Sequence, residues 1–498
     1  MYTHARIPAV IAAVVAAQTL IALEPHAAPA ADPSVNKARL ERVYIVYKTH
    51  FDIGYTSTAH DVVHEYRTEM TDRLIEAIEK NKDQPKERQF VWTLSGFPMQ
   101  QILWEGQSPE RRARIEQAIR DGNIAIHALP YTIHTETAEA EDLVRGLGIS
   151  STLARTYGRP LSISGKSTDV PGQSWILPTL MAHAGIRFFH MGGPVVNFAF
   201  SLPPVFWWEG PDGSRVLTFY NDDYGIPALP PADWPYKTWV HLAMTGDNQG
   251  PPSPDAVGED LEFYRKRGIV AQVGTLDDFF NEFAKEALHA LPVIRADLPC
   301  PWIHGIASMP AATRIAQRSR PLIGALDALA TLERCWGIYR PDLTNVIKTA
   351  YWRTNFAAWI GDGARMTSQV RIWSFAKFDA ESALYTPAME MRVPAVAARS
   401  VARPGTLPPS QSGITLSRRG VAVSAFGPNP DGAGTIFRVW EQGGAGGELT
   451  VTLPAGGKFT TATPVTLRGE TTGAPLEIAA GAFSFPLAAY APASFVLK

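Results

Sequence analysis

The sequence predicts an α/β protein with a (β/α) barrel-like or doubly wound parallel domain, a short helical bundle and a C-terminal antiparallel β-sandwich. Three observations support this prediction. Short apolar runs alternate with helical stretches between residues 43 and 190, the stretch 290–385 is mainly helical, and alternating apolar and polar runs lie between Gly and Pro turns beyond residue 413. A length of 498 residues is enough for two or three domains.

The N-terminal segment has the pattern of a cleavable export signal. Arg6 precedes an apolar run over 7–23, and an Ala-Pro-Ala sequence follows at 28–30. The alternative is a membrane anchor, but Gln18 interrupts the run and the run is short for a bilayer span. We therefore expect 1–30 to be a signal peptide and the mature chain to be periplasmic or secreted.

The first domain, expected over 40–290, reads as strands followed by helices. The predicted strands are 43–47, 89–94, 124–128, 161–164 and 188–190, and the predicted helices are 58–82, 98–120, 138–156 and 175–184. Residues 203–220 read as a hairpin around a Gly-Pro-Asp-Gly turn. In such folds, functional groups lie at the carboxyl ends of the parallel strands.

The second half of the chain no longer alternates strands with helices. A helical region is expected over 291–392, and a linker rich in Pro, Ser, Ala and Arg over 393–412. Runs at 421–424, 435–440 and 448–453 alternate in polarity, which is typical of strands in an antiparallel sandwich over 413–498.

The composition excludes several classes of function. The 46 Lys and Arg nearly balance the 48 Asp and Glu, so a basic nucleic-acid binder is excluded and no anionic membrane surface is expected as a partner. Aromatic residues make up 10% of the chain, which excludes wholesale disorder. Two cysteines are too few for a disulfide framework or a cysteine-based zinc site. No feature predicts an oligomeric state.

The first chemical motif follows the first predicted strand, in Thr-His-Phe-Asp-Ile-Gly-Tyr. His50 and Asp52 are two residues apart, so in a strand both side chains point to one face. An imidazole and a carboxylate that converge there suit a divalent ion such as Zn²⁺. The alternative is a histidine that is hydrogen-bonded to a neighbouring carboxylate.

The second motif is Ser-Thr-Asp-Val-Pro-Gly-Gln-Ser-Trp at 167–175. Asp169 lies between a predicted strand and a predicted helix. There it can bind a metal, attack an anomeric carbon, or do both; its alternative role is helix capping. Ser174 is closer to the helix, so we expect Ser174 to cap it and leave Asp169 free for chemistry.

Together these motifs resemble the α-mannosidases of glycoside hydrolase family 38, especially their divergent bacterial and fungal relatives. The order His-x-Asp-x-Gly-aromatic, then Asp-x-x-Gly-x-Ser, then Ala-Gly-Ile at 184–186 carries the resemblance. The segment 302–310 is similar to the stretch that leads into the family's helical bundle, and 437–442 is similar to part of its C-terminal β-domain.

The resemblance implies a zinc-dependent retaining glycosidase that cleaves α-linked mannosides. It implies that His50 and Asp52 bind one Zn²⁺ per chain, and that Asp169 is both a ligand and the nucleophile. Carbohydrate is then the expected partner, with no nucleic acid, and with no membrane once the signal is cleaved. A retaining enzyme needs a nucleophilic carboxylate and a second carboxyl as acid and base.

The general acid departs from the family pattern. In Thr-Gly-Asp-Asn-Gln-Gly-Pro at 245–251, strict alignment puts Asn248 at the acid position, and an amide cannot donate that proton. Asp247 takes the role by a one-residue shift, or another carboxyl such as Asp222 or Asp223 does. Asp223 and Tyr224 resemble the family's substrate-contacting element more closely. The alternative for 245–254 is a solvated loop.

The fourth metal ligand also departs from the family pattern. The resemblance implies a histidine well downstream of the entry to the helical bundle, but all 12 histidines of this chain lie at or before His304. His304 is the candidate substitute, and 337–395 reads as a deletion or a strongly divergent stretch. His134 and Glu136, just past the third strand, are candidates for contacts with sugar, or else for the hydrogen-bonded rim of the barrel.

Two other functions remain open. A metal-dependent carbohydrate deacetylase needs one Asp and two His around its metal, and a non-catalytic carbohydrate-binding relative needs neither the acid nor the fourth ligand.

Overall fold

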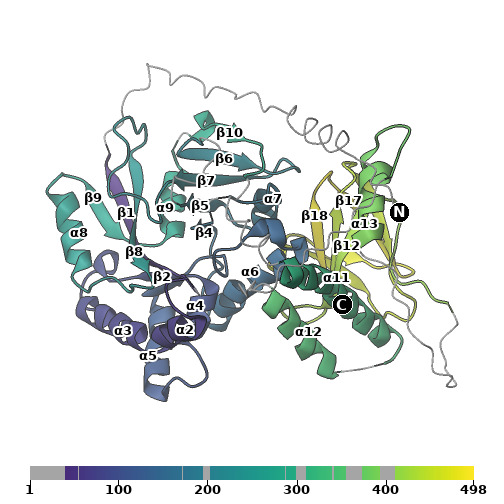
Figure 1. Cartoon of the computed structure of the whole chain (residues 1–498), viewed down its shortest axis with the longest axis horizontal. Coiled ribbons are helices and arrows are strands. Elements are labelled where there is room, and N and C mark those ends of the chain that lie inside the picture. The colour runs from purple at the N-terminus through teal and green to yellow at the C-terminus, as the bar shows by residue number, and fades with distance from the viewer. Residues whose placement is uncertain are drawn as a thin grey trace, which may run out of the picture.

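The computed structural model describes residues 40–53, 55–170, 172–193, 202–286, 288–298, 310–338, 341–354, 373–392 and 410–498. The expected signal peptide, His304 and most of the expected linker lie outside these residues. Figure 1 shows a barrel-like domain, a pair of long helices and a β-domain side by side. Within the described part of the chain, no helix combines the length and the apolar character that a membrane span requires.

The first sheet is parallel throughout. Its strands are β1 (Arg42–His50), β2 (Trp92–Leu94), β3 (Ile124–Ile126), β8 (Thr238–Asp247) and β9 (Val270–Val273). The order is β3-β2-β1-β8, and β9 pairs with the first half of β1. Strand β8 accompanies β1 along its whole length, so their carboxyl ends lie together.

The second sheet is mixed and has the order β10-β6-β7-β5-β4. Its strands are β4 (Ser164–Thr168), β5 (Phe188–Gly192), β6 (Val205–Glu209), β7 (Arg215–Asn221) and β10 (Val293–Ile294). The predicted hairpin is confirmed, because β6 and β7 are antiparallel neighbours around the expected turn.

Two narrow seams join these sheets into a curled, barrel-like wall. At one seam the amide of Ala128 donates to the carbonyl of Ser164 over 2.8 Å. At the other, Ile226 forms an isolated bridge with Leu242 in β8. The barrel-like α/β class predicted from the sequence is therefore confirmed, and side chains on the inner faces of β1 and β4 share one interior.

Helices cover the outside of this wall. They are α2 (Ala59–Arg67), α3 (Glu69–Asn81), α4 (Gly96–Ile102), α5 (Pro109–Asp121), α6 (Ala140–Thr156), α7 (Ile176–His183), α8 (Ala256–Arg265) and α9 (Leu276–Phe283). The single helices predicted over 58–82 and 98–120 are each two helices. The second break is explained by Ser108, which caps α5 and is followed by proline at its first position.

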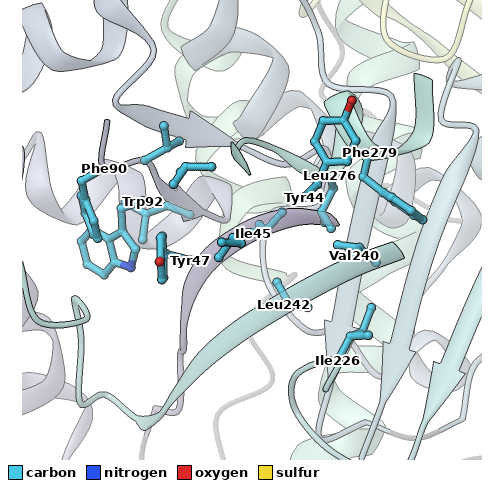
Figure 2. Packing of buried hydrophobic residues seen from close by; sticks show 14 of the residues in the cluster. Tyr44, Ile45, Tyr47, Phe90, Trp92, Ile226, Val240, Leu242, Leu276 and Phe279 are labelled. Atoms are coloured by element: carbon cyan, nitrogen blue, oxygen red, sulfur yellow. The ribbon is translucent and has the colours of Figure 1, made fainter. Parts of the chain in front are cut away.

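The core forms where β1 and β8 meet the helices. Strand β1 is buried from Val43 to its end. Figure 2 shows Ile45 and Tyr47 of β1 packed among Trp92, Val240 and Leu242. Each fully buried aliphatic or aromatic side chain contributes about 1.5–3 kcal/mol, so this cluster holds the strand ends in place.

The C-terminal half contains α11 (Pro310–Cys335), α12 (Pro341–Thr354) and α13 (Thr386–Arg392), followed by two antiparallel sheets. One sheet has the order β11-β14-β17 and the other β12-β13-β18-β15-β16. Their strands are β11 (Thr415–Leu416), β12 (Val421–Pro428), β13 (Thr435–Glu441), β14 (Gly447–Thr452), β15 (Thr461–Val465), β16 (Leu476–Glu477), β17 (Ala482–Leu487) and β18 (Pro492–Leu497).

Three further local predictions were wrong. The fourth strand begins at Ser164, where the predicted strand 161–164 ends. The segment 245–247 is the end of β8 and not a loop, because pairing with β1 extends the strand beyond its apolar part. Ser174 does not cap α7: the helix begins after Trp175 without a side-chain cap, and the Trp175 amide donates to Asp297.

Candidate active site

His50 is the last residue of β1 and lies at the mouth of the barrel. Its ring stacks on that of Tyr224, with centroids 4.2 Å apart and planes 16° apart. Its Nδ1 is 3.3 Å from Oγ1 of Thr168, the last residue of β4. Burial, helped by the charges of two nearby lysines, lowers the pKa of His50 to about 3, so the imidazole is neutral at neutral pH.

Asp169 follows β4 directly and has a left-handed backbone, with φ of 64°. Asp adopts this conformation more readily than most residues, and the strain is typical of functional positions. The amide of Asp169 donates to the carbonyl of Gly192 at the end of β5, over 3.0 Å. The neighbouring strand thus fixes the turn that directs the carboxylate.

Asp247 ends β8 and pairs in register with His50. The Nε2 atom of His50 lies 3.9 Å from an oxygen of Asp247 and 3.9 Å from an oxygen of Asp169. Both carboxylate side chains remain about one-third exposed, at 34% and 36%, so a substrate can reach them. Three strand ends therefore bring one imidazole and two carboxylates together.

Asp52 and Asn248 lie at the rim of this group. The Asp52 carboxylate accepts hydrogen bonds from the amide and hydroxyl of Thr56, both of 2.8 Å. The Asn248 amide is bound to the Asp52 backbone, donating to its carbonyl over 2.7 Å and accepting from its amide over 3.2 Å. Asn248 therefore closes the rim loop, and Asp247 is the carboxyl that β8 brings to His50.

Burial and neighbouring carboxylates raise the pKa of two of these carboxyl groups. Burial and the charges of Asp247 and Asp52 raise the pKa of Asp169 to about 6, although a hydrogen bond from Tyr224 opposes the shift. Burial and Asp52 also raise the pKa of Asp247. Clustered carboxyls with displaced pKa values are typical of sites for acid–base or nucleophilic chemistry.

The remaining predicted residues lie around this group. Tyr224 contacts both His50 and Asp169, whereas the Asp223 carboxylate accepts from the Tyr224 amide and the residue is exposed. His134 and Glu136 belong to a segment that lies against the residues flanking Asp169, since Thr135 Oγ1 accepts from the amide of Ser174. His304 lies outside the described residues.

The donor types at this site suit a zinc ion. Imidazole nitrogen and carboxylate oxygen are zinc ligands, and Oδ1 of Asp247 is buried and accepts no hydrogen bond from any described residue. Ligands of one tetrahedral zinc lie about 3.3 Å apart, less than the 3.9 Å seen here. Accordingly, no three His, Cys, Asp or Glu side chains in the described ranges form a closed metal group.

Two buried lysines beside this group were not predicted from the sequence. Lys48 and Lys166 are buried, with 6% and 2% exposure, and Lys166 donates to Oγ1 of Thr168 over 2.6 Å. The available signal was their position: Lys48 is two residues before His50, so it shares the inward face of β1.

The sequence of the barrel domain matches the model of a known protein family. The glycosyl hydrolases family 38 N-terminal domain matches residues 41–287, which carry every strand end described above. The resemblance to this family is therefore confirmed over residues 41–287. No curated protein matches the sequence of the chain.

Solved structures show a similar fold. An α-mannosidase from Enterococcus faecalis V583 superposes with a TM-score of 0.51 at 17% identity, over 63% of this chain and 38% of that one. A glycosyl hydrolase family 38 protein from Enterococcus faecalis gives 0.44 at 16% identity, over 64% of this chain and 35% of that one. The chain thus spans less than two-fifths of either protein's length.

Proposed function

We propose that this protein is a retaining glycoside hydrolase that cleaves α-linked mannosides. The observation that carries the proposal is the convergence of Asp169 and Asp247 on Nε2 of His50 within a family 38 domain. Since both oxygens are 3.9 Å from one atom, they lie at most twice that distance apart. This limit includes the separation of about 5–5.5 Å of retaining glycosidases and also the lower part of the range of about 6.5–9.5 Å of inverting ones, so the retaining assignment rests on the resemblance to family 38.

Asp169 is the proposed nucleophile. Its carboxylate attacks the anomeric carbon, the bond to the leaving oxygen breaks, and a glycosyl ester forms; water then hydrolyses the ester at the same carbon. The left-handed turn at Asp169 and its hydrogen bond to Gly192 support this role, because they hold the carboxylate in one direction. Tyr224 donates to the same carboxylate and orients it further.

Asp247 is the proposed acid and base. Strand β8 brings its carboxyl to His50, where it can give a proton to the leaving oxygen and later take one from water; its pKa is raised, the direction that a general acid needs. Asn248 cannot do this, and its side chain is bound to the Asp52 backbone. Asp222 is exposed and is the alternative acid that the experiment below separates from Asp247.

We also propose one zinc ion, held by His50, Asp52 and Asp169, with the fourth ligand assigned to His304 from the sequence alone. When bound, the ion supplies positive charge that orients sugar hydroxyls. The donor types, one imidazole and two carboxylates, support a cation at this position. Asp223, His134 and Glu136 are the proposed contacts to the sugar, and export through the N-terminal signal remains part of the proposal.

Azide rescue with an aryl α-mannoside tests the two carboxylates separately. Asp169→Ala and Asp247→Ala should each lose hydrolysis. Azide should then restore turnover in both, and the product differs: direct attack in Asp169→Ala gives the inverted β-mannosyl azide, whereas attack on the glycosyl ester in Asp247→Ala gives the α-mannosyl azide. Asp83→Ala, a change in an exposed turn, is the matched control and should behave as wild type.

The product stereochemistry decides between assignments. Hydrolysis that survives in purified Asp169→Ala refutes the mechanism, and rescue of Asp222→Ala in place of Asp247→Ala moves the acid role to Asp222. Mannoside binding without turnover in wild type favours the non-catalytic relative, for which the amide at Asn248 is the supporting observation. Release of acetate from an acetylated sugar favours the deacetylase.

A further inference from the structure

Residues 222–225, which we call the Tyr224 loop, carry Tyr224 from the end of β7 to the candidate active site. The loop has the sequence Asp-Asp-Tyr-Gly, and both aspartates are exposed. Tyr224 is therefore its only apolar side chain, and the loop has no hydrophobic core of its own. Its position depends on the hydrogen bonds that tie it to the neighbouring strands.

The side-chain amide of Asn221, the last residue of β7, closes the Tyr224 loop. Its nitrogen donates to the carbonyl of Gly225 over 2.5 Å and to the carbonyl of Asp223 over 3.2 Å. The Asp223 carbonyl also lies directly against Gly192 at the end of β5, where a Cβ atom would collide with it. One amide thus ties both the middle and the end of the loop to the sheet.

His190 of β5 fixes the orientation of this amide. Its Nε2 lies 2.6 Å from Oδ1 of Asn221, and the residue is fully buried. Carbonyl oxygens only accept hydrogen bonds, so the amide nitrogen faces the loop, the amide oxygen faces the imidazole, and Nε2 carries the proton. Burial, together with Lys166, lowers the pKa of His190 to about 3, so the ring is neutral and this N–H is the one it has.

The far end of this chain of contacts is the proposed nucleophile. The Tyr224 ring stacks on His50 and its hydroxyl donates to the Asp169 carboxylate. We propose that Asn221 and His190 are positioning residues of the hydrolase site, acting through Tyr224. His190 orients the amide, the amide holds the Tyr224 loop, and the loop sets the hydroxyl against Asp169. The inference rests on the proposed function, because its consequence is the rate at which Asp169 attacks the sugar.

Asn221→Asp breaks this tie with almost no change in shape. A carboxylate still accepts from His190, but it has no N–H for the two loop carbonyls and repels them. Since a misplacement of about 1 Å costs up to about 100-fold in rate, we expect kcat/KM for an aryl α-mannoside to fall at least tenfold. The loss should be equally large with a dinitrophenyl mannoside, whose leaving group needs no protonation, because the defect concerns the nucleophile and not the acid.

Asn429→Asp is the matched control. The amide of Asn429 also closes a turn, donating to the carbonyl of Ala433 over 3.3 Å, but this turn belongs to the β-domain. The same change of amide to carboxylate should therefore leave kcat/KM at the wild-type value. A loss in Asn429→Asp as large as that in Asn221→Asp overturns the inference, because the effect is then not specific to the Tyr224 loop.

A double variant separates positioning from a general loss of structure. In a Tyr224→Ala background, Asn221→Asp should lower kcat/KM less than about twofold, whereas independent effects multiply. His190→Leu should lose as much activity as Asn221→Asp, and His190→Gln should recover most of that loss, because its amide donates from the position of Nε2. Losses that multiply in the double variant, or His190→Gln as inactive as His190→Leu, overturn the inference.

Crystal structures of wild type, Asn221→Asp and His190→Leu distinguish this inference from the proposed function. The ring centroids of Tyr224 and His50 are 4.2 Å apart, and we expect this separation to grow by at least about 1 Å in either variant. Movement of the ring together with a wild type that hydrolyses no mannoside refutes the proposed function and leaves the tie between Asn221 and the loop intact. A ring that keeps its place in both variants overturns the inference, whatever the activity of wild type.

Discussion

Arg438 connects the β-sandwich to the barrel domain through a buried ion pair. Its Nη1 donates to both oxygens of Glu141 in α6, over 2.7 and 2.6 Å, and its Nε donates to Ser494 over 2.7 Å. The residue is only 1% exposed. Glu141 also accepts from Arg145 over 2.7 Å, so one carboxylate serves two guanidinium groups.

Removing Arg438 and removing Glu141 should lower the free energy of unfolding by different amounts. Breaking a buried ion pair costs about 3–5 kcal/mol, because a charge is left without compensation. Arg438→Met leaves Glu141 paired with Arg145, so we expect the lower end, about 3 kcal/mol. Glu141→Gln leaves the buried Arg438 guanidinium without a carboxylate, whereas Arg145 keeps its ion pair with Asp327, so we expect the upper end, about 5 kcal/mol.

Urea unfolding measures these differences through the shift of the midpoint at unchanged slope. Arg265→Met is the matched control, because Arg265 forms an exposed ion pair with Glu262 and its loss should not move the midpoint. If Arg438→Met unfolds at the same urea concentration as Arg265→Met, the ion pair does not hold the two domains together and the reasoning fails.

Three further predictions concern the site, the acid stability and the metal. In Gly192→Ala the new methyl group meets the backbone carbonyl of Asp223, so the segment that carries Tyr224 is displaced from His50 and kcat/KM should fall at least tenfold; Gly258→Ala, where a methyl group meets nothing, should keep full activity. Burial opposes ionisation of Asp212, but hydrogen bonds from His183, Ser214 and Thr179 outweigh it and lower its pKa to about 2. Because the folded pKa is below the unfolded one, this stabilisation of about 2 kcal/mol is complete above pH 4 and disappears as the pH falls towards 2, so Asp212→Asn should flatten the dependence of stability on pH in that window; an equally steep curve in the variant contradicts this. Exhaustive chelation should abolish hydrolysis of aryl α-mannosides and zinc should restore it, whereas full activity in metal-free protein excludes the proposed ion.

Local patterns predicted most of the architecture. The hydrophobic run at 43–47 identified β1, and the polar turn at 210–213 identified the β6–β7 hairpin. These features were predictable because they depend on residues close together in the chain. The end of β8 at 245–247 was missed for the opposite reason: its residues are polar, and only pairing with β1 makes them part of a strand.

The residue types at the candidate site were also readable from the sequence, since His50, Asp52 and Asp169 stand beside strands in recognisable motifs. Their mutual arrangement was not. Whether Asp247 or Asn248 reaches His50 depends on the register of β8 against β1, which shifts by one residue at Thr49 and His50. A one-residue slip in a strand reverses every side chain, so only the paired structure decides which of the two faces the imidazole.

The approach of Lys48 to Lys166 depended wholly on the tertiary structure. Lys48 and Lys166 lie on strands of different sheets, and each is an ordinary residue in its own segment. They come together because a seam of backbone hydrogen bonds between Ala128 and Ser164 curls the two sheets around one interior. Sequence determined which strands and chemical groups this protein has; closure of the barrel decided which of those groups meet, because contacts between distant strands leave no periodic signal along the chain.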